Sequence, residues 1–182
     1  PRVEKIGNIT VHRIGAAIEN PQVSDREMHW RLRLSKALFS FTAFWKATRL
    51  GSSEVYDMTW ALMANNAGFA ALFFKWRHPK TPYYLELQDG RAFSDMAKRR
   101  PMLALIWPLY RGVYLRADKI KAISNFIAAE VRDIGYTKTI EIIPNAVDVA
   151  KFSAIVPAEK IAALKEKYGK REGDVFLFTA SR

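Results

Sequence analysis

Residues 119–143, KIKAISNFIAAEVRDIGYTKTIEII, decide the fold that the sequence predicts. A β-rich run from Lys119 to Ile123 is followed by a helical pattern from Ser124 to about Ile134, and then by a second β-rich run, Ile140 to Ile143. A strand, a helix and a strand at this spacing form a right-handed crossover between parallel neighbours. The stretch therefore predicts a parallel β-sheet with helices packed on it.

The same alternation continues on both sides of this stretch. It predicts strands at 9–14, 55–61, 83–87 and 175–179, and helices at about 65–76 and 158–168. We therefore expect an α/β fold: a Rossmann-like domain whose mostly parallel sheet is covered by helices on both faces.

Two further segments are typical of long basic helices. The first follows Ser24 and Glu27, which have the spacing of a capping box, and ends at about residue 51. The second spans roughly residues 93–116, and its two prolines, Pro101 and Pro108, are each expected to break or kink it. In the first helix four large apolar residues recur at helical spacing and share one face: Leu34, Leu38, Phe41 and Trp45.

Composition limits the class of protein. The chain has 182 residues, 49% of them apolar, which is enough for a packed core. It has no cysteine, so disulfides and thiolate metal sites are excluded, and a reducing, cytoplasmic location is expected. The formal net charge of +11 favours an anionic partner: a phosphorylated small molecule, an acidic lipid surface or nucleic acid.

The apolar segments are too short to cross a membrane. A spanning helix needs roughly 20 apolar residues, and the longest runs, 68–74 and 102–109, fall well below that. The chain opens on a charged, strand-like stretch instead of the apolar core of a signal peptide, so we expect that its beginning has been cut or lost.

Three strand ends are candidate ligand sites, because ligands of parallel α/β sheets bind beyond the carboxyl ends of the strands. The strand at 83–87 ends in Gln88, Asp89 and Gly90. Ser124 and Asn125 follow the next strand, where Ser124 can cap a helix whose positive end attracts phosphate. After residue 143 the chain reads PNAVDVAKF, in which a proline ends the strand and Asn145 suits a turn.

The ordered set of these pieces resembles the N-terminal half of a GT-B glycosyltransferase of family 4. The pieces are EVYDMTWA (54–61), YYLELQDG (83–90), ADKIKAISNFIAAEV (117–131), IEIIPNAVDVAKF (140–152) and DVFLFTASR (174–182). Three positions depart from the family pattern. Gln88 stands where a histidine is common, and Ala146 and Ser181 stand where glycine is usual.

The resemblance implies a division of labour along the chain. Residues 1–152 would form the acceptor-side Rossmann-like domain, although its first, central strand is missing, so that the sheet is gapped, filled by another chain or built differently. Residues 153–182 would be a linker helix and the first strand of an absent C-terminal donor-binding domain. The reaction implied is transfer of a sugar, with retention of configuration, from a nucleotide-sugar to an acceptor such as a lipid-linked or envelope glycan, without a metal ion.

The resemblance also implies roles for residues. Gln88 and Asp89 would lie beside the reacting centre, where Gln88 can donate or accept a hydrogen bond but cannot act as a base. Arg182 matches an arginine that contacts the donor pyrophosphate, and this contact suits the fork of donors on a guanidinium. Four residues would bind the acceptor: Gly90, Ser124, Asn125 and Asn145.

Other functions remain open at this point. A non-catalytic binding module of the same fold is the main alternative, and a hydrolase that pairs Glu86 with Asp89 is weaker, since the two carboxylates face different ways.

The basic helices either build the core while their charges are solvated, or attach to an anionic membrane, the inner face of the cell membrane, through Trp30, Trp45 or Trp107. Nucleic acid is an unlikely partner because the chain has no recognised binding module. His12, His29 and His78 lack metal-ligand spacing.

Overall fold

The structure is a computed structural model that describes residues 2–18, 28–89 and 105–177. The chain divides into two compact units, Pro1–Pro144 and Asn145–Arg182, and each is described by itself. Gly90, Pro101, Arg182 and the pair Ser24 and Glu27 lie outside the described residues.

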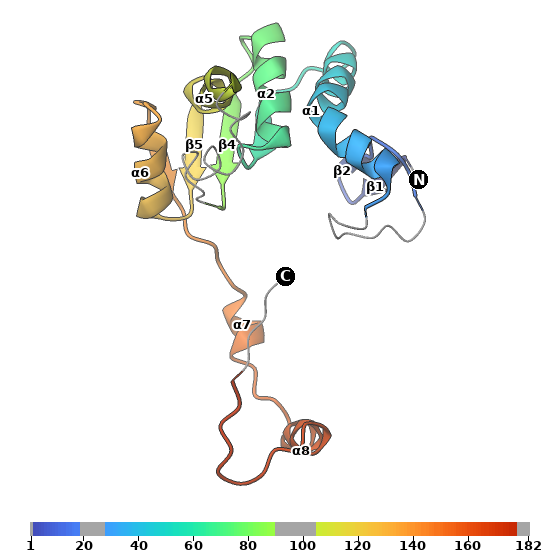
Figure 1. Cartoon of the computed structure of the whole chain (residues 1–182), viewed down its shortest axis with the longest axis vertical. Helices are drawn as coiled ribbons and strands as arrows, with labels where there is room; N and C mark the ends of the chain where they lie inside the picture. The colour runs from blue at the N-terminus through green and yellow to red at the C-terminus, as the bar shows by residue number, and fades with distance from the viewer. Residues whose placement is uncertain (1, 19–27, 90–104, 178–182) are drawn as a thin grey trace. The chain divides into compact units, whose positions relative to one another are not determined.

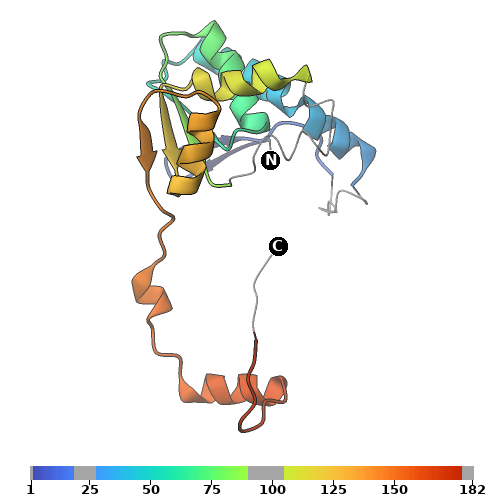
Figure 2. The ribbon, with the colours of Figure 1, turned by 60° about the vertical axis from the view of Figure 1, so that its left-hand side comes forward.

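A four-stranded parallel sheet is the centre of the first unit (Figures 1 and 2). Its strands are β3 (Thr59–Leu62), β4 (Tyr83–Leu87), β5 (Lys119–Ala122) and β6 (Ile140–Ile142), and they lie side by side in chain order. The Rossmann-like α/β fold is thus confirmed. β3 forms one edge of the sheet; among the described residues it pairs only with β4.

The core lies between one face of the sheet and the helices that connect its strands. These helices are α2 (Asn66–Arg77), α5 (Trp107–Leu115) and α6 (Asn125–Asp133). Successive right-handed crossovers in one direction place their helices on the same face. Strand residues in register on that face pack with buried residues of all three helices: Ala61, Leu85 and Ile120 from the strands, and Leu72, Val113 and Val131 from the helices.

The other face of the sheet carries a polar row. Glu86 of β4 is the register partner of Leu62 on one side and of Lys121 on the other, and Lys121 is in turn opposite Glu141. The row lies near the carboxyl ends of the strands, where the candidate site was expected.

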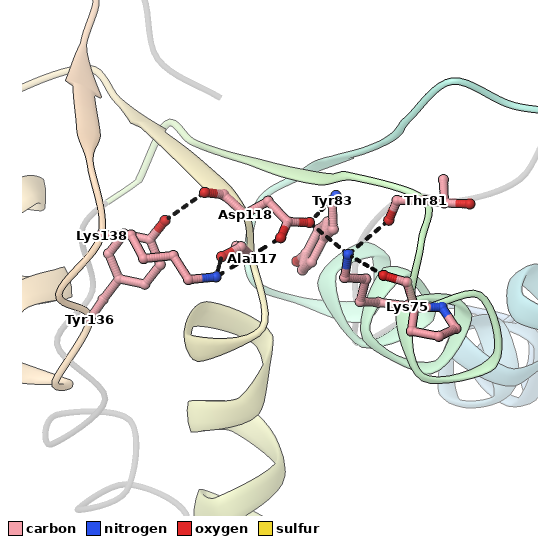
Figure 3. Close-up of polar contacts among 8 residues, drawn as sticks. Lys75, Thr81, Tyr83, Ala117, Asp118, Tyr136 and Lys138 are labelled. Carbon is pink, nitrogen blue, oxygen red and sulfur yellow. Dashed lines mark hydrogen bonds and ion pairs between the residues drawn. The ribbon is translucent and has the colours of Figure 1, made fainter.

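An ionic cluster fixes the amino ends of β4 and β5 (Figure 3). The Asp118 carboxylate accepts hydrogen bonds from Lys75 Nζ at 2.8 Å and from the backbone N–H of Tyr83 at 2.7 Å. Lys75 also donates to two carbonyls of the turn before β4, and Lys138 reaches Asp118 from the other side, at 3.9 Å. Burial opposes ionisation of Asp118, but these hydrogen bonds outweigh it and lower its pKa.

The first part of the chain forms a hairpin and a long helix. β1 (Val3–Ile6) and β2 (Ile9–His12) pair antiparallel as a separate two-stranded sheet, and Gly7 supplies the positive φ, +57°, that their turn needs. α1 (Trp30–Gly51) packs alongside α2 (Figure 1). It begins at Trp30 and not at the predicted capping box, because His29 Nδ1 accepts the N–H of Arg31 and serves as the N-cap.

Pro108 lies in the first turn of α5, where its missing N–H leaves no hydrogen bond unmade. Of the break or kink expected at this proline, the structure shows a break, because α5 begins at Trp107. In the second unit, α7 (Val149–Phe152) and α8 (Ala158–Lys167) form, but the predicted strand at 175–179 is absent from its described residues, 175–177. Among the described residues of this unit, 145–177, there is no strand with which they could pair.

Candidate functional site

The carboxyl ends of β4 and β5 bring four of the predicted residues to one rim of the sheet. Leu87 of β4 is the register partner of Ala122 of β5, so Gln88 and Asp89 leave the sheet next to Ser124 and Asn125. Asn145 is the first residue of the second unit, and Gly90 and Arg182 fall outside the described residues. The roles predicted for Asn145, Gly90 and Arg182 therefore stay predictions.

Gln88 is held by a buried ion pair. Its side-chain Nε2 donates to Glu86 Oε1 at 3.0 Å, and the same oxygen accepts Lys121 Nζ at 2.8 Å. Glu86 is 3% exposed, so this carboxylate needs such partners to remain charged. The hydrogen bond from Lys121 and that from Gln88 lower the pKa of Glu86, against the effect of burial. The arrangement fixes the Gln88 amide at the rim.

This pKa bears on the hydrolase alternative. A carboxyl group that protonates a glycosidic oxygen must keep its proton near neutral pH, which requires a raised pKa. Glu86 has a lowered pKa and two hydrogen-bond donors on one oxygen, so it is an anchor for Gln88 and not a general acid. Lys121, which makes this anchor possible, was missed from the sequence. The alternation KIKA in β5 was its only signal, because it puts both lysines on the face away from the core.

Asp89 lies beyond this network and is exposed, as is Gln88. Both residues thus lie at the surface of the strand end. Asp89 and Glu86 differ in burial as well as in direction: Asp89 lies at the surface of the rim, whereas Glu86 is buried.

Ser124 caps α6 as the sequence predicts. Its backbone is extended, with φ −155° and ψ 160°, and its Oγ accepts the N–H of Ile127 at 3.4 Å. Asn125 is the first residue of the helix. The positive end of α6 thus points to the same rim as Gln88 and Asp89, where it favours an anionic or strongly polar ligand.

Met63, at the end of β3, is a rim residue that the sequence gave no reason to select. It is the one non-glycine residue of the described ranges with a positive φ, +72°, a conformation that methionine adopts at a cost. Its Sδ accepts the backbone N–H of Gln88 at 3.3 Å, and Asn65, two residues on, caps α2 by accepting the N–H of Ala67. The ends of β3 and β4 are therefore joined directly.

Within the described residues no group of three His, Asp or Glu side chains is arranged to hold a metal ion. The same part of the chain contains no helix that is both long and apolar enough to cross a membrane.

Comparison with known protein families identifies the family of this domain. Residues 11–151 match the family model described as Glycosyltransferase Family 4, a match that includes all four parallel strands and the residues at their carboxyl ends. The chain belongs to glycosyltransferase family 4. No curated protein matches the chain.

Proposed function

We propose that this family 4 domain is the N-terminal, acceptor-binding half of a retaining glycosyltransferase. In this proposal residues 1–152 hold the acceptor, while residues 153–182 lead into a donor-binding domain that carries most of the nucleotide-sugar contacts. The family match over residues 11–151, centred on the parallel sheet, is the observation that supports it.

The proposed division of roles follows from the chemistry of the rim. Asp89, exposed beyond the strand end, orients the acceptor hydroxyl, and Gln88, held by Glu86, hydrogen-bonds a sugar or phosphate oxygen. Ser124 and Asn125, together with Gly90 and Asn145, complete the acceptor site. Arg182 contacts the donor pyrophosphate.

The acceptor in this proposal is a lipid-linked or envelope glycan, met at the inner face of a membrane. The net charge of +11 is the supporting feature, because anionic lipid headgroups and the phosphates of a lipid-linked acceptor both favour a basic surface.

Turnover by the complete natural protein tests the proposal. A panel of nucleotide-sugars is incubated with the protein and a lipid extract, and transfer to the acceptor is measured for the wild type and for Asp89→Asn. A lost hydrogen bond to the reacting hydroxyl should lower kcat/KM about 10- to 100-fold. The matched control is Asp133→Asn, which removes an exposed carboxylate at the other end of α6.

Two results would contradict the proposal. Asp89→Asn and Asp133→Asn could turn over equally, which would remove Asp89 from the site. Alternatively, the complete protein could bind a glycan acceptor but transfer no sugar from any donor, which would favour the non-catalytic binding module.

A further inference from the structure

One face of α1 exposes a continuous row of large apolar side chains, here called the α1 stripe. It consists of the following residues, whose exposed fractions are given in parentheses: Trp30 (66%), Leu34 (51%), Leu38 (44%), Phe41 (53%) and Trp45 (69%). The sequence predicted correctly that four of these residues share a face, but the reading in which that face builds the core is wrong.

The reason is that α1 uses its opposite face to pack. Ser40 is buried, and its Oγ donates to the backbone carbonyl of Asn66 at 2.9 Å, while Asn66 Nδ2 donates to the carbonyl of Lys36 at 3.0 Å. Phe39, Ala43 and Ala47 line the cavity of about 610 Å³ that α1 shares with α2 and β3. The α1 stripe is therefore a second apolar face.

Within α1 and α2, every charged side chain is basic. At about 100° per residue, the five stripe residues fall within an arc of about 80°; Arg31 and Arg49 lie just past one edge of this arc and Arg33 past the other. Neither α1 nor the neighbouring α2 contains an Asp or Glu. A protein surface usually mixes both signs, so an apolar row beside which α1 carries arginines and no acidic residue points to an anionic counterpart.

The apolar surface continues from α1 onto α2. Phe41 stacks on Phe73 with ring centroids 5.4 Å apart, and Phe73 contacts the exposed Trp76 at 5.7 Å. Trp107, by contrast, is half-buried and stacks on Tyr110 of the core, so of the three tryptophans considered from the sequence only Trp30 and Trp45 are well exposed.

We propose that the α1 stripe docks on the surface of an anionic lipid bilayer. α1 would lie in the plane of the interface, with its tryptophans at headgroup level and its arginines against lipid phosphates, as amphipathic interfacial helices do. Charge complementarity between the arginines beside the row and lipid phosphates favours an anionic bilayer over a protein partner. The docking surface deepens the membrane location proposed above, but it does not depend on sugar transfer, so vesicle binding and turnover can fail separately.

Sedimentation of the chain with lipid vesicles tests this docking surface. The vesicles are phosphatidylcholine alone, or phosphatidylcholine in which phosphatidylglycerol replaces part of the lipid, and no sugar donor is present. We expect binding to the anionic vesicles, weakened by salt because screening shortens the range of the arginine charges. Leu38→Gln/Trp45→Gln should lower the partition coefficient about tenfold or more.

Matched variants on α8 distinguish lipid binding through the α1 stripe from nonspecific binding by any exposed apolar side chain. Leu164→Gln/Tyr168→Gln removes a similar pair of exposed apolar side chains and should bind as the wild type does. Arg31→Gln/Arg49→Gln should weaken binding about fivefold for each arginine, whereas Lys160→Gln/Lys165→Gln, with the same net charge, should weaken it less.

Three outcomes overturn the inference. The first is equal binding to neutral and anionic vesicles, and the second is equal loss of binding in the α1 and α8 variants. The third is self-association of the chain without lipid that Leu38→Gln/Trp45→Gln abolishes, which would make the stripe a contact between copies. Circular dichroism of each variant verifies that the helices are retained.

Discussion

At Gly68, near the start of α2, the packing leaves no room for a methyl group. A Cβ there would lie 2.7 Å from Val113 Cγ1 and 3.1 Å from the carbonyl oxygen of Met63, and Val113 is fully buried. We expect Gly68→Ala to lower the free energy of unfolding by about 1–3 kcal/mol, although alanine is the better helix former. The control is Gly112→Ala in α5, where the nearest atom, Leu72 Cδ2, is at 3.4 Å and the change should be under about 1 kcal/mol. Urea unfolding, monitored by tryptophan fluorescence, measures the free energy of unfolding of both variants. Equal stability of the two variants would refute this packing argument.

Residues whose role is local were the ones that could be predicted from sequence. Ser124 caps α6 because a serine before an apolar helical pattern satisfies helix N–H groups wherever it occurs. The constraints on Gly68 and Met63 come from the approach of α2, β3 and α5, which only the tertiary structure creates. For the same reason the Glu86–Lys121–Gln88 network was missed, since its members lie on two strands that the sequence separates by more than thirty residues.

Where α2, β4 and β5 meet, Asp118 makes the stability of the first unit depend on pH. Its pKa is lower in the folded chain than its ordinary value of 3.8, so folding favours the ionised form. The stabilisation that the ionised carboxylate gives is complete at pH values above its ordinary pKa. It is lost as the pH falls through the lower pKa of the folded chain. Asp118→Asn should therefore lower stability at neutral pH and flatten its decline below about pH 5, while the exposed Asp57→Asn should leave that decline as it is. Unfolding temperatures measured from neutral to acid pH test this prediction. Parallel plots of unfolding temperature against pH for the wild type and Asp118→Asn would contradict the role given to this carboxylate.

Elements with strong periodicity were predicted closely, and elements that need a distant partner were not. β5, α6 and β6 lie within a residue or two of their expected ends, because each is bounded by its own cap or turn. The hairpin of β1 and β2 depends on pairing across Gly7, and residues 175–177 remain unpaired although their sequence suits a strand. The α1 stripe shows the limit of periodicity: the spacing identifies an apolar face but does not say whether protein covers it.

For the whole molecule, the division into two units predicts unequal resistance to proteolysis. The described residues of the second unit, 145–177, include none that is buried, whereas the first unit contains the whole of the buried core. Segments without buried contacts open at little free-energy cost and are cleaved first. Limited trypsin digestion should therefore cut first at lysines and arginines of residues 151–171, and a chain ending at Pro144 should unfold at the same temperature as the full chain to within about 2 °C. Cleavage in α2 at the same rate would contradict this difference in resistance. A large fall in the unfolding temperature of the shortened chain would show that residues 145–182 contribute to the core.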